Sequence, residues 1–494
     1  MCHPERSKGS RFLAQGKLRE ESHRVNKLKN RDSSLPAGGQ GLTPQNDITT
    51  QSPRGRGREG CSISMIYFLY NIVLTCLLVI SAPYFFLRSL IQKRFRKALP
   101  QRMGFFQNPS FKRPIWVHAA SVGEVFCSIP LLKKIKEEFP HLKIVLTTMT
   151  YTGNETAKTY LPEADQVLFV PIDHPLIIWR TIEKIQPGLL LVAETELWPN
   201  LLRSCGKKGI PIVLFNGRIS QKSFRRYLLF KFFFKECLKY ISLFLMQTEE
   251  DRTRIIEIGG ESQRTRTVGN LKFDQTFPSF TQEALTEMAK ALGLGGKEKI
   301  LIAGSTHSGE EEILVTLYKE LKKMDPHLVL ILAPRHLERL EEVERVLKKE
   351  SLSWLRKTSP LLGAGRSDQE QPEVILLDTM GELVGIYNLG TLIFVGGSLV
   401  PIGGHNPLEP LFFRKCVLFG PYMFNFLEIS SRLIETGGAI QVSGKEELFS
   451  QLKRLLFDEV ARQEVGEKGY QFLQKHQGAT ERMLEEIRPF LLRL

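Results

Sequence analysis

Residues 188–200 read GLLLVAETELWPN and join an apolar run to two acids and then to a proline. The apolar run ends at Ala193 and predicts a buried strand. Burying a carboxylate at such a strand end is costly unless it has a partner or a task. Capping of a helix that starts near Pro199 offers a structural explanation for Glu196, but it explains Glu194 less well.

The same alternation of short apolar runs and longer amphipathic stretches extends on both sides of this segment. Strands are predicted at residues 115–118, 143–148, 166–170, 189–193, 210–215 and 243–246, and again at 300–303, 328–332, 374–377, 392–395, 417–419 and 439–442. Strand–helix alternation predicts parallel sheets with right-handed crossovers. Because a less regular stretch separates the two sets, we expect an α/β fold with two Rossmann-like, doubly wound domains facing a cleft. Ligands are expected at the carboxyl ends of the strands.

The N-terminal region differs from the rest in composition. Residues 1–64 are basic and polar without apolar periodicity, which indicates a disordered extension, or a segment that precedes a true start at Met65. A nucleic-acid-binding arm is the alternative. An uncharged apolar stretch and then a basic flank follow, so we predict an uncleaved membrane anchor over residues 65–90 with the body in the cytoplasm. Pro83 is also compatible with a kink or a partial, interfacial insertion.

The net charge of +15 favours anionic partners. The seven cysteines are scattered, and neither a Cys-x-x-Cys pair nor a Cys/His cluster at zinc-ligand spacing is present. An aromatic and basic stretch at residues 223–247 predicts docking on anionic lipid. A core helix with a solvated basic face is the alternative for that stretch.

Two further polar segments follow predicted strands in the first set. Small residues and glycine turn the chain at residues 119–124 and leave Glu124 near a helix start. A carboxylate there complements the helix dipole or serves as a general base. Lys272, in the segment GNLKFD at 269–274, lies at the seam between the two strand sets, where an ammonium neutralises phosphate or carboxylate charge.

In the second set, glycine-rich or polar segments follow four strands, at residues 303–311, 333–336, 378–383 and 396–410. The turn at residues 303–311 has the backbone character of an anion site but lacks the Gly-Lys-Ser/Thr ending of a Walker A loop. Arg335 offers a fork of donors to a phosphate. A long glycine run at residues 396–410 lets the backbone approach a ligand closely, and Glu409 can accept a bond from ribose hydroxyls. The chain shows no dinucleotide-binding fingerprint and no Asp-x-Asp metal motif, so we expect no cofactor and no metal.

The chain resembles the 3-deoxy-D-manno-octulosonic acid (Kdo) transferase family of lipopolysaccharide synthesis in eight segments that occur in the family's order. The segments are 118–125, 194–201, 216–220, 269–274, 304–312, 334–336, 380–383 and 396–410. The resemblance runs from about Met65 to the C-terminus. It implies the two-domain glycosyltransferase architecture called GT-B, with an N-terminal membrane anchor.

The resemblance also implies an activity and its residues. Kdo would pass from CMP-Kdo to the lipid A precursor (lipid IVA) at the cytoplasmic face of the bacterial inner membrane, by base-assisted direct displacement with inversion and with CMP as leaving group. Glu124 would be the proton acceptor, and Glu194 and Lys272 would stabilise the transition state. The residues implied to bind CMP are Pro334, Arg335, Met380, Gly381, Glu382, Asn406, Pro407, Leu408 and Glu409.

We therefore expect six segments and three partners. The segments are the extension 1–64, the anchor 65–90, an acceptor-side domain 91–270, a linker 271–297, a CMP-sugar-binding domain 298–475, and a C-terminal helix 476–494 that packs back on the first domain. The partners are CMP-Kdo, the lipid A precursor and anionic lipid of the inner membrane, with no nucleic acid. The alternatives are a GT-B transferase for another lipid-linked sugar, and a non-catalytic membrane protein that binds anionic lipid.

Overall fold

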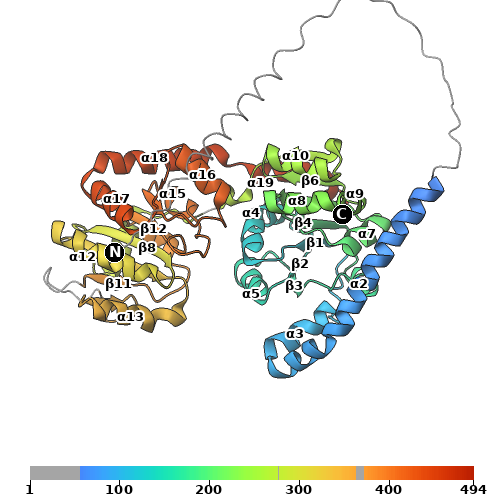
Figure 1. Cartoon of the computed structure of the whole chain (residues 1–494), viewed down its shortest axis with the longest axis horizontal. Helices are drawn as coiled ribbons and strands as arrows, with labels where there is room; N and C mark the ends of the chain where they lie inside the picture. The colour runs from blue at the N-terminus through green and yellow to red at the C-terminus, as the bar shows by residue number, and fades with distance from the viewer. Residues whose placement is uncertain (1–55, 276, 363–371) are drawn as a thin grey trace, which may run out of the picture. The chain divides into compact units, whose positions relative to one another are not determined.

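The computed structural model describes residues 56–275, 277–362 and 372–494 (Figure 1). The chain divides into two units, Met1–Cys61 and Ser62–Leu494. Apart from the first residues of helix α2, the features described below belong to the second unit. The extension predicted at residues 1–64 falls outside the described residues as far as residue 55.

The first sheet has seven parallel strands in the order β3-β2-β1-β4-β5-β6-β7. Its strands are β1 (Ile115–His118), β2 (Ile144–Thr148), β3 (Gln166–Phe169), β4 (Leu189–Ala193), β5 (Ile212–Gly217), β6 (Leu243–Met246) and β7 (Thr265–Thr267). Strands β1, β2 and β4 are buried throughout, as apolar strands covered on both faces should be.

The second sheet repeats this design with the order β10-β11-β9-β8-β12-β13-β14, again parallel throughout. Its strands are β8 (Lys299–Thr306), β9 (Leu328–Pro334), β10 (Trp354–Arg356), β11 (Val374–Leu376), β12 (Leu392–Val395), β13 (Val417–Phe419) and β14 (Ile440–Gln441). Two parallel-sheet α/β domains confirm the predicted fold class.

Helices precede the first strand, connect the strands of both sheets and follow the last strand (Figure 1). Up to the second sheet they are α2 (Arg56–Ile91), α3 (Lys93–Arg102), α4 (Val122–Glu138), α5 (Tyr151–Tyr160), α6 (Pro175–Ile185), α7 (Pro199–Lys207), α8 (Gln221–Leu229), α9 (Lys231–Leu238), α10 (Glu249–Ile258), η1 (Ser262–Arg264), η2 (Leu271–Asp274) and α11 (Gln282–Ala291). The later ones are α12 (Glu310–Met324), η3 (Leu337–Arg339), α13 (Leu340–Lys349), α14 (Leu383–Tyr387), α15 (Leu408–Phe412), α16 (Leu427–Glu435), α17 (Lys445–Phe457), α18 (Glu459–His476) and α19 (Ala479–Leu491).

Two apolar clusters cover the two faces of the first sheet, because alternate strand residues point to opposite faces. Ile115 and Val117 of β1 join helices α4 and α5 in one cluster, whereas Trp116 joins α6, α7 and α10 in the other. The last helix of the chain, α19, buries Met483 and Ile487 in the first of these clusters. The C-terminal helix thus contributes core to the N-terminal sheet.

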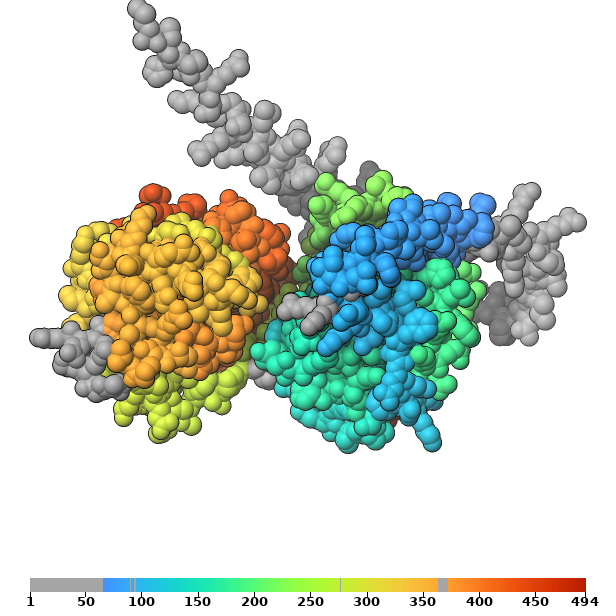
Figure 2. All heavy atoms as spheres, turned by 90° about the horizontal axis from the view of Figure 1, so that it is seen from below, coloured from blue at the N-terminus to red at the C-terminus, as the bar shows by residue number. Residues whose placement is uncertain are grey.

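Helix α2 includes the segment that is long and apolar enough to cross a membrane, Met65–Arg88. Its N-terminal turns contact the first domain. Tyr67 is 1% exposed, and the Tyr70 hydroxyl donates to an Asp173 carboxylate oxygen at 3.0 Å. Side chains further along the helix, such as Ile80, remain exposed. Figure 2 shows α2 and α3, in blue, lying on the surface of this domain.

The order of the strands reverses between β1 and β4 in the first sheet, and between β8 and β12 in the second. In open α/β sheets, ligands bind beside the carboxyl ends of the strands at such a switch point. The segments after these four strands hold Glu124, Glu194, the turn 303–311 and the glycine run 396–410. The topology therefore puts four of the segments selected from the sequence at the switch points of the two sheets.

Candidate active site

Glu124 is in the first turn of α4 and is 8% exposed. Its carboxylate accepts hydrogen bonds from the Ala120 backbone N–H at 2.7 Å and from the Ser121 hydroxyl at 2.9 Å. Burial and then the negative charges of Glu194 and Glu196 raise the pKa of Glu124 to about 7, although the two hydrogen bonds oppose the shift. The side chain therefore completes the start of the helix and is also poised to exchange a proton near neutral pH.

Glu194 follows β4 directly and has a φ of 52°, in the left-handed region that non-glycine residues rarely occupy. Such a conformation costs about 1 to 3 kcal/mol and persists where the surrounding structure enforces it. The Glu194 backbone N–H donates to the Phe215 carbonyl at 2.9 Å, and its carboxylate lies 3.5 Å from the Arg218 guanidinium. This strained turn places the Glu194 charge where it acts on Glu124.

Lys272 is held by a relay of amide hydrogen bonds. The Asn216 carbonyl accepts from the Gln247 side chain at 2.9 Å, and Gln247 accepts from the Asn270 side chain at 2.8 Å. Asn270 then caps η2 by accepting from the Lys272 backbone N–H at 3.0 Å. The Lys272 ammonium acts electrostatically on Cys127, one turn beyond Glu124 on α4.

The same stretch of chain also touches the second domain. The Lys272 ammonium lies 4.9 Å from the centroid of the Phe426 ring, beside the start of α16. Three residues further on, the Gln275 side-chain carbonyl accepts from the Asn406 amide at 3.3 Å. The turn η2, which contains Lys272, thus packs against the Glu124 helix, and Gln275 just after it contacts the loop that was expected to bind CMP.

Asn406 also donates to Glu409 at 3.2 Å, which fixes the first turn of α15. Burial raises the pKa of Glu409 to about 7, and the Asn406 bond and the Arg335 charge oppose the shift. Arg335 follows the last residue of β9, Pro334, and is exposed. Its guanidinium has no hydrogen bond or ion pair with residues in the described ranges, so its donors are available.

The remaining CMP-site candidates lie after β11, at the start of α14. Met380 is 61% exposed, and Gly381 has a φ of 86° that favours glycine. The Glu382 carboxylate accepts hydrogen bonds from the Lys357 ammonium and from the Thr379 hydroxyl. Burial acts to raise the pKa of Glu382, but these two bonds lower it overall. This segment thus contains an exposed apolar side chain and a carboxylate whose pKa is lowered.

Two buried polar residues near the carboxyl ends of β1 and β5 were given no role from the sequence. His118, the last residue of β1, is fully buried, and burial lowers its pKa to about 4. Its Nδ1 pairs with Thr147 Oγ1 at 3.2 Å, while its Nε2 has no partner among the described residues. Asn216 is also buried, its side-chain amide nitrogen has no hydrogen-bond partner within the described part of the chain, and its φ is 52°. Both residues belong to segments that carry the family resemblance, 118–125 and 216–220. Their burial and the positive φ of Asn216 are apparent only from the structure.

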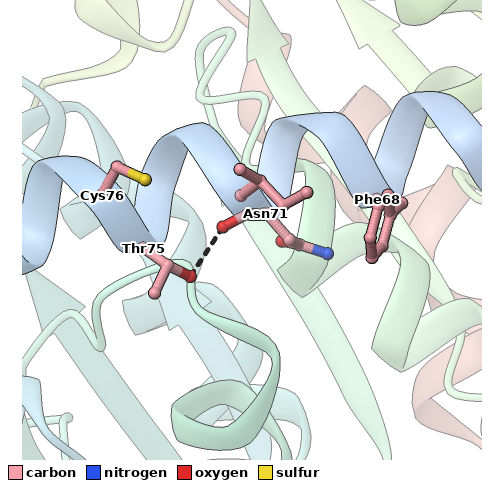
Figure 3. A pocket seen from close by; sticks show the side chains of 5 residues that line it. Phe68, Asn71, Thr75 and Cys76 are labelled. Atoms are coloured by element: carbon pink, nitrogen blue, oxygen red, sulfur yellow. Dashed lines mark hydrogen bonds between the residues drawn. The ribbon is translucent and has the colours of Figure 1, made fainter.

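A hollow of about 320 Å³ lies on helix α2 (Figure 3). Its lining residues all belong to that helix and are Phe68, Asn71, Ile72, Thr75 and Cys76. None of the predicted catalytic or CMP-binding residues is among them. The hollow is therefore a feature of helix α2 and separate from the candidate active site.

Comparison with known proteins identifies the family. The model of the 3-deoxy-D-manno-octulosonic-acid transferase (kdotransferase) family matches residues 97–275. The Kdo transferase of Haemophilus influenzae is 36% identical over 433 residues, which cover 86% of this chain and 100% of that protein. A putative UDP-N-acetylglucosamine 2-epimerase from Listeria monocytogenes shares the fold, with a TM-score of 0.51 and 15% identity over 76% of this chain and 96% of its own.

A crystal structure of the C-terminal CMP-Kdo binding domain of WaaA from Acinetobacter baumannii aligns with 39% of this chain and 97% of its own, at 28% identity and a TM-score of 0.36. The relationship to the Haemophilus influenzae enzyme extends over nearly the whole of the two-domain body. The chain is therefore a glycosyltransferase and belongs to the 3-deoxy-D-manno-octulosonic acid transferase family.

Proposed function

We propose that this enzyme transfers Kdo from CMP-Kdo to the lipid A precursor, lipid IVA, at the cytoplasmic face of the inner membrane. The observation that carries the proposal is that Glu124, a buried carboxylate with a raised pKa, lies on α4, against which the Lys272 turn η2 packs. The Lys272 ammonium itself lies over the Phe426 ring of the second domain. Direct attack of the acceptor hydroxyl on the anomeric carbon, without a covalent enzyme intermediate, inverts that carbon.

Glu124 has the properties required of the proton acceptor. A general base works best when its pKa is near the working pH, and the pKa of Glu124 is raised to about 7. The acceptor hydroxyl gives its proton to the carboxylate as its oxygen bonds to the sugar. The Ala120 and Ser121 hydrogen bonds hold the carboxylate at the start of α4, so it needs no reorientation during the reaction.

Glu194 and Lys272 suit the two charges that develop during transfer. The sugar gains oxocarbenium character as the bond to phosphate breaks, and a carboxylate such as Glu194 stabilises that positive charge. The departing CMP gains negative charge, which the Lys272 ammonium stabilises. The backbone of each residue is fixed, that of Glu194 by the left-handed turn after β4 and that of Lys272 by the Asn270 cap.

The second domain, residues 298–475, is proposed to hold the CMP part of the donor, and residues 91–270 are proposed to serve the acceptor. Arg335 supplies donors for the phosphate, and Glu409 accepts from ribose hydroxyls in a position fixed by Asn406. The other proposed contacts with CMP come from Pro334, Met380, Gly381, Glu382, Pro407 and Leu408.

The proposed lipid side of the first domain consists of α2 and the exposed apolar residues of α8 and α9. Leu229 of α8 is 79% exposed and Phe232 of α9 57%, beside the basic residues of the same two helices. Such a surface suits anionic lipid headgroups over an apolar interior. Because Tyr67 and Tyr70 attach the N-terminal end of α2 to the domain that follows its C-terminal end, these contacts favour interfacial insertion over a single perpendicular crossing.

The proposal is tested with the full chain in detergent or lipid, by incubation with CMP-Kdo and lipid IVA and mass measurement of the lipid. We expect a Kdo-modified lipid from the parent enzyme and almost none from Glu124→Ala. Glu137→Ala on the exposed side of the same helix is the control and should retain full activity. Turnover of a UDP-sugar but not of CMP-Kdo would overturn the choice of donor. Unchanged function in Glu124→Ala would favour a non-catalytic, lipid-binding role.

A further inference from the structure

Two histidines from different loops of the second domain meet edge to edge. His307 follows β8 and His405 belongs to the glycine run after β12. Their Nε2 atoms are 2.9 Å apart, their ring planes differ by 3°, and their centroids are 5.1 Å apart. With coplanar rings at this centroid distance, the two Nε2 atoms point directly at each other. One Nε2 therefore donates a proton to the other, and the pair shares a single proton along this axis.

A buried carboxylate holds the two loops in register. Glu310, which is 0% exposed, accepts from the backbone N–H of His307 at 3.0 Å. It also accepts from the N–H groups of Gly397 at 2.7 Å and of Ser398 and Leu399 at 2.9 Å each. Four backbone donors on one side chain fix the β8 turn against the start of the glycine run. Glu310 is thus a positioning residue for the pair.

The glycine run leaves room for the pair. A Cβ atom added to Gly397 would lie 3.1 Å from His405 Cδ2 and 3.4 Å from His307 Cδ2. Gly397 also has a φ of 67°, which favours glycine. A side chain there would push the two rings apart, so the sequence at this position is matched to the imidazole contact.

Arginine and histidine side chains act on the pair, and one of the arginines, Arg339, is itself ion-paired with Glu311 and Glu342. Arg335 and His336 act on both rings, and Arg339 acts on His307. The carboxylate of Glu310 faces them from α12, but backbone N–H groups occupy its oxygens. Burial and then Arg335 lower the pKa of His405 to about 3, and burial and then His336 lower the pKa of His307. Both rings are therefore uncharged at neutral pH when no anion is bound.

We propose that the His307–His405 pair is an anion site that takes up one proton when the phosphate of the nucleotide binds beside Arg335. With one shared proton, one outer Nδ1 is a donor and the other an acceptor. A second proton converts both outer Nδ1 atoms into donors that face anionic oxygens. A phosphate supplies the negative charge that makes this protonation favourable. The inference deepens the proposed function and rests on it.

The protonated His307–His405 pair also stabilises CMP as it leaves. When the bond between the sugar and the phosphate breaks, both bonding electrons stay on the phosphate oxygen, and the phosphodiester monoanion becomes a monoester dianion. The added charge falls beside a pair that already carries the extra proton. The acceptor's own proton goes to Glu124, so the imidazole pair holds its proton throughout and releases it when CMP dissociates.

The test measures protons taken up on CMP binding, by titration calorimetry of the full chain in buffers of different ionisation enthalpy. At pH 7.5, CMP is almost entirely a dianion, because a phosphate monoester has its second pKa near about 6. We expect the parent to take up roughly 0.3 to 1 proton per CMP. His405→Gln and His307→Gln should each lose most of this proton uptake. Both variants should still bind CMP, with lower affinity than the parent. His327→Gln, an exposed histidine of the same domain, is the control and should match the parent.

Cytidine is the second probe and should bind without proton uptake, because it lacks the phosphate. CMP binding to the parent without uptake would overturn the inference while leaving the proposed function intact. Uptake that persists unchanged in both histidine variants, or that cytidine also produces, would overturn it as well. Failure of CMP to bind at all would overturn the proposed function together with the inference. If one histidine variant does not fold, the other decides the result.

Discussion

Replacing Glu124 by glutamine should abolish transfer and at the same time stabilise the enzyme above neutral pH. Glutamine has nearly the shape of glutamate and keeps an acceptor oxygen for the Ala120 N–H, but it cannot take a proton from the acceptor. Loss of a general base lowers turnover by about 10² to 10⁴-fold. The stability of the variant separates this role from simple helix capping, because the two roles predict opposite signs.

The magnitude follows from the pKa of Glu124, which is about 7 in the folded protein against an ordinary value of 4.5. A raised carboxyl pKa means that the folded state favours the protonated form. The parent therefore has this contribution in full below pH 4.5 and loses it as the pH rises towards 7. The loss reaches about 3 kcal/mol at pH 8. Glutamine carries no charge, so the variant avoids this loss of stability at pH 8, but it gives up about 1 kcal/mol of hydrogen bonding. The free energy of unfolding of the variant should therefore exceed that of the parent by about 2 kcal/mol at pH 8.

Thermal unfolding at pH 4.5 and at pH 8, beside a transfer assay, measures both effects. For a domain of this size, about 2 kcal/mol corresponds to a rise in Tm of roughly 4 to 8 °C at pH 8, and the rise should vanish or reverse at pH 4.5. Glu137→Gln, on the same helix with one exposed ion pair, should change neither quantity appreciably. A lower Tm for Glu124→Gln at pH 8 together with retained transfer would show that Glu124 only caps the helix.

Further outcomes are expected from other parts of the site. Lys272→Met should lower kcat/KM by about 10² to 10³-fold in the transfer assay, and a normal rate would remove it from the mechanism. Asn406→Ala frees Glu409 and should weaken CMP binding about tenfold or more in calorimetry. Tyr70→Phe removes the bond to Asp173 and should cost about 1 kcal/mol in thermal unfolding. Transfer should persist in EDTA, and its loss with recovery on added Mg²⁺ would contradict the metal-free reaction.

The sequence predicted the architecture well because apolar runs and strand–helix alternation are local signals. Six strands of each sheet were expected close to where they lie, including the buried β4. The seventh strand of each sheet was missed. In β7 the sequence is Thr-Arg-Thr at the edge of the sheet, and β10 is a half-exposed Trp-Leu-Arg, also at an edge. Edge strands of three residues bury too little apolar surface to leave a periodic pattern.

The sequence was less informative about how the site is held together. Glu124 and Lys272 were selected from their places after strands, and the structure brings both to helix α4. The contact between His307 and His405 joins residues almost a hundred positions apart and depends on the four backbone bonds to Glu310. No spacing rule links such residues, because tertiary packing alone brings the two loops together. The left-handed backbone conformation of Glu194 also could not be predicted from the sequence, because the surrounding tertiary structure enforces it.

The central claim is that a base in the first domain and CMP-binding groups in the second domain act on the same donor. The mass of the lipid product tests this claim most directly. Full-length parent, Glu124→Gln and Arg335→Ala are each incubated with CMP-Kdo and lipid IVA. We predict a lipid heavier by Kdo from the parent alone. A parent that leaves the lipid unchanged, or two variants that modify it as fast as the parent does, would contradict the account.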